Sequence, residues 1–75
     1  MTAVDVVFRY GAPPEESDLG AIQRIREVYG IRRIQFDEAA RTVRVEYDAT
    51  RLSASDVGAL LRGAGVDLRD QVQLV

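Results

Sequence analysis

The chain has 75 residues, of which 47% are hydrophobic and 29% charged, and this balance predicts one soluble globular domain spanning residues 1–75. Its formal charge of −2 at pH 7 gives no overall field that would attract nucleic acid or an anionic membrane. Cysteine and histidine are absent, which removes the thiol nucleophile, the thiolate metal ligand and the usual proton shuttle. No apolar run approaches the ~20 residues that cross a bilayer, and no signal-peptide pattern begins the chain, so we expect a cytoplasmic protein.

Hydrophobic residues alternate with other residues over positions 4–10, which predicts a strand with one buried face. The inward phase consists of Val4, Val6, Phe8 and Tyr10, and the outward phase of Asp5, Val7 and Arg9. Gly11 and the two prolines that follow predict a loop after this strand.

A helix is predicted after the loop, with Ser17 as its candidate N-cap. The carboxylates of Glu15, Glu16 and Asp18 suit the unpaired N–H groups of a helix start. An apolar stripe at helical spacing predicts the face that packs on a sheet, and its members are Leu19, Ile22, Ile25, Val28 and Tyr29. Gly30 stands where a left-handed residue commonly ends a helix.

Two further strands are predicted as a hairpin joined by a turn over residues 37–41. Their inward residues are Ile31, Ile34, Phe36, Val43, Val45 and Tyr47, and their outward residues are Arg33, Gln35, Arg44 and Glu46. Asp37 belongs in the turn, because Asp side chains hydrogen-bond nearby backbone groups.

A second helix is predicted from the capping-box spacing of Ser53 and Asp56. Its apolar stripe consists of Val57, Leu60, Leu61 and Ala64, and Gly65 ends it. A last strand is suggested by Val66, Leu68, Val72 and Leu74, with an interruption around Arg69 and Asp70. This order predicts an α+β, ferredoxin-like βαββαβ two-layer sandwich, with an antiparallel four-stranded sheet and both helices on one face.

Residues 30–37, 42–48 and 52–65 resemble the heavy-metal-associated (HMA) domain of copper chaperones and metal-pumping ATPases. In that family a Gly-Met-x-Cys-x-x-Cys loop precedes the first helix, and its two thiolates hold a soft metal ion. The resemblance places Pro14 and Ser17 at the two cysteine positions, so the CxxC metal motif is absent. It also places Gly11 at the motif glycine, Ala12 at the methionine, and Val66 where bacterial members commonly carry tyrosine.

The first strand leaves one alternative open. The family's spacing from Gly11 would turn Val7 and Arg9 inward, whereas the alternation turns Phe8 and Tyr10 inward. A one-residue slip exchanges the two faces of a strand, so a loop one residue shorter than the family's would remove the conflict.

No metal, cofactor or catalytic residue is expected from the residue types present. Soft ions require sulfur donors, and the only sulfur belongs to Met1. Glu15, Glu16 and Asp18 are weak candidates for a hard cation, because Ca²⁺ and Mg²⁺ accept carboxylates, although complementing a helix start explains the same residues.

The resemblance and the missing thiolates together suggest a small non-enzymatic HMA-like domain that acts as a protein-interaction or regulatory module related to metal trafficking. Its expected partner is another protein or a second copy, through the face of Arg33, Gln35, Arg44 and Glu46 or through the edge around residues 34–36. Arg32 and Arg33 equally suit an edge that discourages pairing. Two alternatives stay open: a metal-binding or transport protein that uses carboxylates or a shared site, and a small-ligand-sensing regulatory domain.

Overall fold

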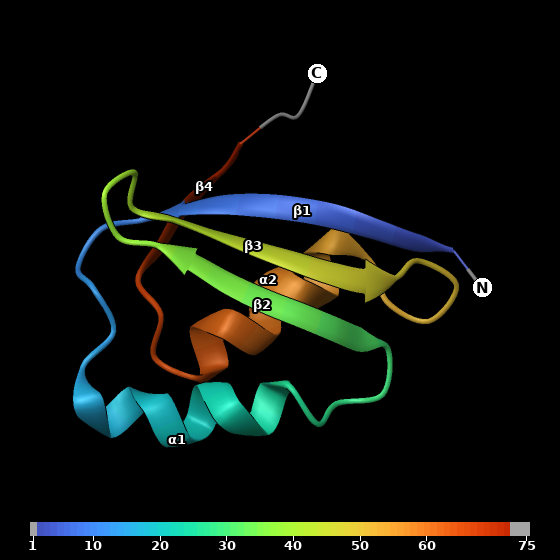
Figure 1. The fold of residues 1–75 in the computed structure, drawn as a ribbon, viewed down its shortest axis with the longest axis horizontal. Coiled ribbons are helices and arrows are strands. Elements are labelled where there is room, and N and C mark those ends of the chain that lie inside the picture. The colour runs from blue at the N-terminus through green and yellow to red at the C-terminus, as the bar shows by residue number, and fades with distance from the viewer. Residues whose placement is uncertain (1, 73–75) are drawn as a thin grey trace.

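A computed structural model describes residues 2–72 as four strands and two helices in two layers (Figure 1). In chain order the elements are β1 (Ala3–Tyr10), α1 (Glu16–Ile25), β2 (Ile31–Asp37), β3 (Thr42–Asp48), α2 (Ala54–Gly63) and β4 (Leu68–Val72). Neighbouring strands are antiparallel in the order β2-β3-β1-β4, which confirms the ferredoxin-like α+β fold. Met1 and Leu74, which the sequence analysis used, lie outside the described residues.

One apolar cluster joins the sheet to both helices. Ile22 and Ile25 enter it from α1, and Val57 and Leu61 enter it from α2. The main strand members are Val6, Phe8, Tyr10, Ile31, Ile34, Val43, Val45 and Tyr47. Both helices therefore cover the same face of the sheet, and no layer of the described chain covers the other face, which is called here the outer face (Figure 1).

The alternation predicted for β1 is confirmed. Val6 lies opposite Val45 on β3, Phe8 lies opposite Val43, and all four side chains belong to the core. Val7 and Arg9 accordingly point to the outer face, as the alternation predicted and contrary to the family's spacing.

A β-bulge accounts for the uneven spacing of the inward residues of β2. The register of β2 against β3 shifts between Ile31, opposite Tyr47, and Arg33, opposite Glu46. The extra residue lets Ile31 and Ile34 both reach the core although three positions separate them. Asp37, predicted in the turn, is instead the last residue of β2, because its pairing with Thr42 continues the ladder; its carboxylate accepts the N–H of Ala40 in the turn at 3.1 Å, as its residue type predicted.

The start of α1 differs from the prediction. The N-cap is Glu15, whose own N–H donates to the Asp18 carboxylate at 3.0 Å, and Ser17 lies inside the first turn. Ser17 as the cap is therefore wrong, because a carboxylate at the third helical position can reach back to an N-cap two residues before Ser17.

The apolar stripe of α1 is shorter than predicted. Leu19 and Tyr29 are 54% and 70% exposed, so placing them on the buried stripe is wrong. The helix ends at Ile25, and Tyr29 consequently falls in the turn before Gly30 rather than on a helical face. Gly30 has φ +103°, the left-handed conformation predicted for it, but it lies five residues beyond the end of α1, so its predicted role as the helix end is wrong.

The second helix follows the prediction closely. The Asp56 N–H donates to the Ser53 hydroxyl at 3.1 Å, and the Ser53 N–H donates to the Asp56 carboxylate at 2.9 Å. Val57 and Leu61 are fully buried, and Gly65 follows the helix with φ +97°.

The last strand is irregular where its composition suggested. Phe8 pairs with Gln71 and Tyr10 with Leu68, so the register of β4 shifts across Arg69 and Asp70. Within residues 2–72, neither helix is both long and apolar enough to span a membrane.

Candidate functional site

The Asp67 carboxylate joins the loop between β1 and α1 to the segment just before β4. The Gly11 N–H donates to the backbone carbonyl of Asp67 at 2.9 Å, and the Ala12 N–H donates to Asp67 Oδ2 at 3.0 Å. The Arg69 guanidinium donates to the same Oδ2 atom at 3.0 Å. These contacts, the Ala12 N–H foremost and Arg69 after it, lower the pKa of the Asp67 carboxyl below its ordinary value, although partial burial opposes them.

The Gly11 backbone also links the loop to the β2–β3 turn. Arg41 Nη1 donates to the Gly11 carbonyl at 2.7 Å, and the Arg41 carbonyl accepts the Tyr10 N–H at 2.9 Å. A Cβ atom at Gly11 would lie 2.5 Å from both Arg69 Nε and Asp67 Oδ2. The absence of a side chain at Gly11 therefore lets these charged groups lie against the backbone.

The two positions that the resemblance assigned to cysteines lie in this region but supply no soft donor. Pro14 is half-buried in the loop and has no ligating atom in its side chain. Ser17 is exposed in the first turn of α1 and offers a hydroxyl. A soft ion of the family's kind does not fit this donor set, because such ions select thiolate or thioether ligands.

The carboxylates of Glu15, Glu16 and Asp18 are not brought together as a metal centre. Asp18 accepts the Glu15 N–H, and its Oδ1 atom would lie 2.5 Å from a Cβ atom at Gly65. Across residues 2–72, no three Asp or Glu side chains are grouped as metal ligands require. The first turn of α1 therefore uses its acids to complete the helix start and to pack against the loop before β4.

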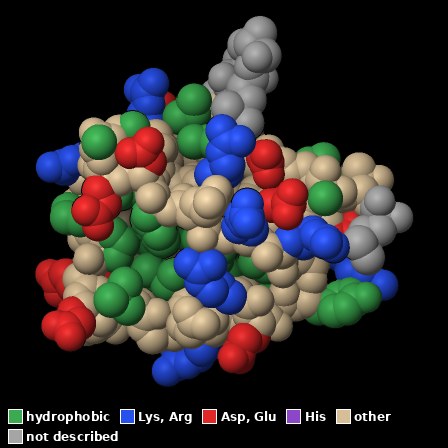
Figure 2. Space-filling model, viewed as in Figure 1, with side chains coloured by type: hydrophobic (Ala, Val, Ile, Leu, Met, Phe, Trp, Pro, Cys, Tyr) green, Lys and Arg blue, Asp and Glu red, His purple; other side chains and the backbone are tan. Residues whose placement is uncertain are grey.

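Arg33, Gln35, Arg44 and Glu46 lie together on the outer face of the sheet, as predicted, and with Asp5 they line a small depression of about 140 Å³. Figure 2 shows basic and acidic side chains intermixed over the strands on this face. Arg44 Nη1 lies 3.3 Å from Asp5 Oδ2, and Arg32 Nε lies 3.8 Å from Glu46 Oε1. These four side chains are 37–50% exposed, so the pairs organise the surface more than they stabilise the fold.

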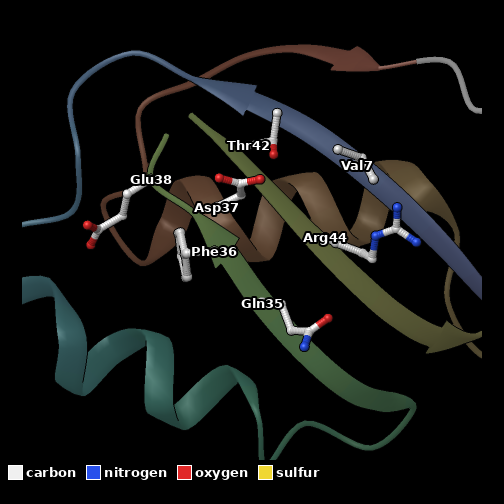
Figure 3. A pocket seen from close by; sticks show the side chains of 7 residues that line it. All are labelled: Val7, Gln35, Phe36, Asp37, Glu38, Thr42 and Arg44. Carbon is white, nitrogen blue, oxygen red and sulfur yellow. The ribbon is translucent and has the colours of Figure 1, made fainter. Parts of the chain in front are cut away.

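A second, larger depression of about 640 Å³ lies beside the first, over β2 and β3 (Figure 3). Its lining consists of Val7, Gln35, Phe36, Asp37, Glu38, Thr42 and Arg44. Val7 is only 6% exposed, although it belongs to the outer face, where it lies between Arg44 on β3 and Val72 on β4. The depression combines a guanidinium, an amide and carboxylates with the apolar side chains of Val7 and Phe36.

Asp37 and Thr42 also line this face, although the sequence did not predict them there. Both residues flank the turn and lie opposite each other in the register, so counting outward from the turn would have placed them beside Gln35 and Arg44.

The pairing of Tyr29 with Arg51 carried no sequence signal, because the two residues lie in separate turns. The Arg51 guanidinium is 4.2 Å from the centroid of the exposed Tyr29 ring.

Tyr10, whose backbone N–H bonds to Arg41 in the β2–β3 turn, carries a buried hydroxyl. Its hydroxyl has no hydrogen-bond partner among residues 2–72, and its ring packs edge-on against Phe36 with centroids 5.8 Å apart. Burial raises the pKa of the Tyr10 hydroxyl above its ordinary value, and the nearby Glu38 carboxylate raises it further.

Comparisons of this chain with protein-family models, curated proteins and solved structures gave no match.

Proposed function

We propose that this chain is a small non-enzymatic module for protein interaction or regulation, related to metal trafficking. In this proposal it has the scaffold of an HMA domain and has lost the soft-metal site. The closure of the β1–α1 loop by Asp67 carries the proposal, because that loop is where the resembled family holds its ion.

The contacts of the loop support the loss of the metal site. The Asp67 carboxylate is already engaged by the Ala12 N–H and the Arg69 guanidinium. A carboxylate and a hydroxyl are hard donors, and an adjacent guanidinium opposes a cation. These residues stabilise the loop in place of a metal ion.

The outer face supports an interaction role. Arg33, Gln35 and Arg44 are exposed there beside the half-buried Glu46, and no described element covers them. Intermixed charges of both signs on this face provide specificity towards a complementary protein rather than general attraction to a polyanion.

Calorimetric titration with Cu⁺, Zn²⁺ and Ca²⁺ tests the loss of the metal site. The wild-type protein should give no stoichiometric heat with any of the three ions. The variant carrying both P14C and S17C should bind Cu⁺, because the two thiolates would stand at the family's ligand positions. A stoichiometric heat from the wild type would overturn the proposal, and a folded double variant that binds no Cu⁺ would contradict the HMA scaffold.

A further inference from the structure

The β2 strand forms one edge of the sheet, and the hydrogen bonds of β3 show which of its backbone groups face outward. The Tyr10 N–H donates to the Arg41 carbonyl at 2.9 Å, and the Ala49 N–H donates to the Thr2 carbonyl at 2.8 Å. Odd-numbered residues of this segment therefore bond to β1. Since backbone groups of an antiparallel strand alternate between its two neighbours, the even-numbered residues of β3 bond to β2.

Because of this alternation, two residues of β2 have backbone N–H and C=O groups that point away from β3. Gln35 lies opposite Arg44 and Asp37 lies opposite Thr42, so Gln35 and Asp37 direct their N–H and C=O groups at β3. Ile34 and Phe36 alternate with these residues along the strand. Their N–H and C=O groups therefore point to the open edge of the sheet. The register is regular from Arg33 to Asp37, so this part of the edge can accept another strand.

Two of the charged side chains on this edge form no ion pair within residues 2–72, whereas Arg32 pairs with Glu46. Asp5 and Arg44 pair with each other in the interior of the outer face. Arg33 and Asp37, by contrast, form no ion pair with any part of the chain between residues 2 and 72. Both side chains are exposed, and they stand four residues apart on the same face of the strand.

We propose that two copies of this chain associate through β2, antiparallel to each other, with Gln35 facing Gln35 of the second copy. In this register Arg33 lies opposite Asp37 of the second copy, and the two-fold axis repeats the pair. Ile34 lies opposite Phe36 of the second copy on the inner face, and both offer the outward backbone groups that a ladder needs. The arrangement makes a continuous eight-stranded sheet. Across the new pair of strands, each charged side chain faces one of opposite charge and each apolar side chain faces another apolar one.

The other edge of the sheet is less suited to this pairing. The β4 strand has five residues, and its register against β1 shifts between the partners of Phe8 and Tyr10. Irregular, short edge strands resist strand addition. The dimer specifies a partner for the proposed interaction module and in that sense rests on the proposed function.

Analytical ultracentrifugation with charge reversal tests the dimer. The wild-type protein should show a concentration-dependent species of twice the 8.3 kDa monomer mass. A single pair of edge strands buries little surface, and such interfaces are weak. The protein concentration in the series should therefore reach about 1 mM. R33D and D37R should each weaken association by about tenfold or more, because each replaces two attractive pairs by two repulsive ones. The variant carrying both R33D and D37R should associate as the wild type does.

Arg9→Asp is the matched control, because Arg9 is exposed on the same face but belongs to the interior strand β1. It should leave association unchanged, and circular dichroism of each variant checks its fold. A wild type that stays monomeric throughout the series would overturn the dimer, as would a folded double-reversal variant that fails to regain association. Neither result bears on the metal titrations, which test the proposed function separately.

Discussion

The Asp67 carboxylate accepts the Ala12 N–H at 3.0 Å, although 55 residues separate the two in the sequence. Asp67 lies just before β4, and Ala12 lies in the loop after β1. Arg69 holds the same carboxylate oxygen from the β4 side. The Asp67 side chain thus ties the loop that joins the first strand to the first helix to the start of β4, beside the backbone bond from Gly11 and the contact from Arg41.

Asp67→Asn should weaken the fold in a pH-dependent way, because it removes the charge that Ala12 and Arg69 favour. The pKa of Asp67 is lowered in the folded protein, so its stabilisation is complete above the ordinary value of 3.8. That stabilisation is lost as the pH falls through the lower pKa of the folded state. Urea midpoints of wild type and variant should therefore differ at neutral pH and converge in acid.

Asp70→Asn is the control for this comparison, because Asp70 is exposed on β4, three residues after Asp67. Its urea midpoint should stay close to that of the wild type. A gap between wild type and Asp67→Asn that stays constant from neutral pH into acid would contradict the assigned role of the charge.

Gly65→Ala should destabilise the fold, whereas Gly20→Ala should stabilise it. Gly65 has φ +97°, and a Cβ atom there would lie 2.5 Å from Asp18 Oδ1, so we expect a loss of more than about 1 kcal/mol. Gly20 lies inside α1, where an added Cβ meets no atom within 4 Å. Alanine there should raise the free energy of unfolding by about 0.5–1 kcal/mol. Denaturant unfolding measures both, and equal effects would show that the local backbone is misassigned.

Leu61→Ala and Leu19→Ala should differ strongly although both remove the same atoms. Leu61 is fully buried, and its truncation should cost about 2–5 kcal/mol. Leu19 is 54% exposed, and its truncation should change the free energy of unfolding by less than about 0.5 kcal/mol. Urea unfolding compares the two, and a large loss at Leu19 would mean that another surface covers it in solution.

Tyr10→Phe should leave stability unchanged or raise it by about 1 kcal/mol, because the buried hydroxyl has no partner among residues 2–72. The raised pKa of Tyr10 also means that stability falls once the pH passes the ordinary value of 10.0. The variant lacks that alkaline loss. Tyr29→Phe, at an exposed ring, is the matched control, and a clear destabilisation by Tyr10→Phe would reveal a hydrogen bond to the hydroxyl.

Much of the fold follows from patterns that depend on only a few neighbouring residues. The alternation of Val6, Phe8 and Tyr10 gave the buried face of β1, and the spacing of Ser53 and Asp56 gave the start of α2. Both signals are local, so the sequence carries them directly.

The misplaced residues depend on where elements end or on distant contacts. Ser17 was displaced because Glu15 and Asp18 complete the first turn of α1 between them. Tyr29 has the spacing of the apolar stripe, but the helix ends at Ile25. Beyond that residue the spacing no longer predicts which side chains are buried. Helix boundaries balance competing caps, and the periodicity of the interior does not report that balance.

The candidate site was predictable in part for the same reason. Arg33, Gln35, Arg44 and Glu46 share the outer face because strand alternation places them there. The hold of Asp67 on the β1–α1 loop joins segments from opposite ends of the chain. Composition and spacing carry no signal for such a contact.

The strand order has a consequence for how the protein acquires its structure during synthesis. The first strand made, β1, bonds only to β3 and β4, which leave the ribosome later. The β2–β3 hairpin, by contrast, closes across a short turn, which costs little entropy. The β1 strand can therefore pair only after β3 has been made, and the β1–α1 loop can gain its contact with Asp67 only after residue 67 has been made.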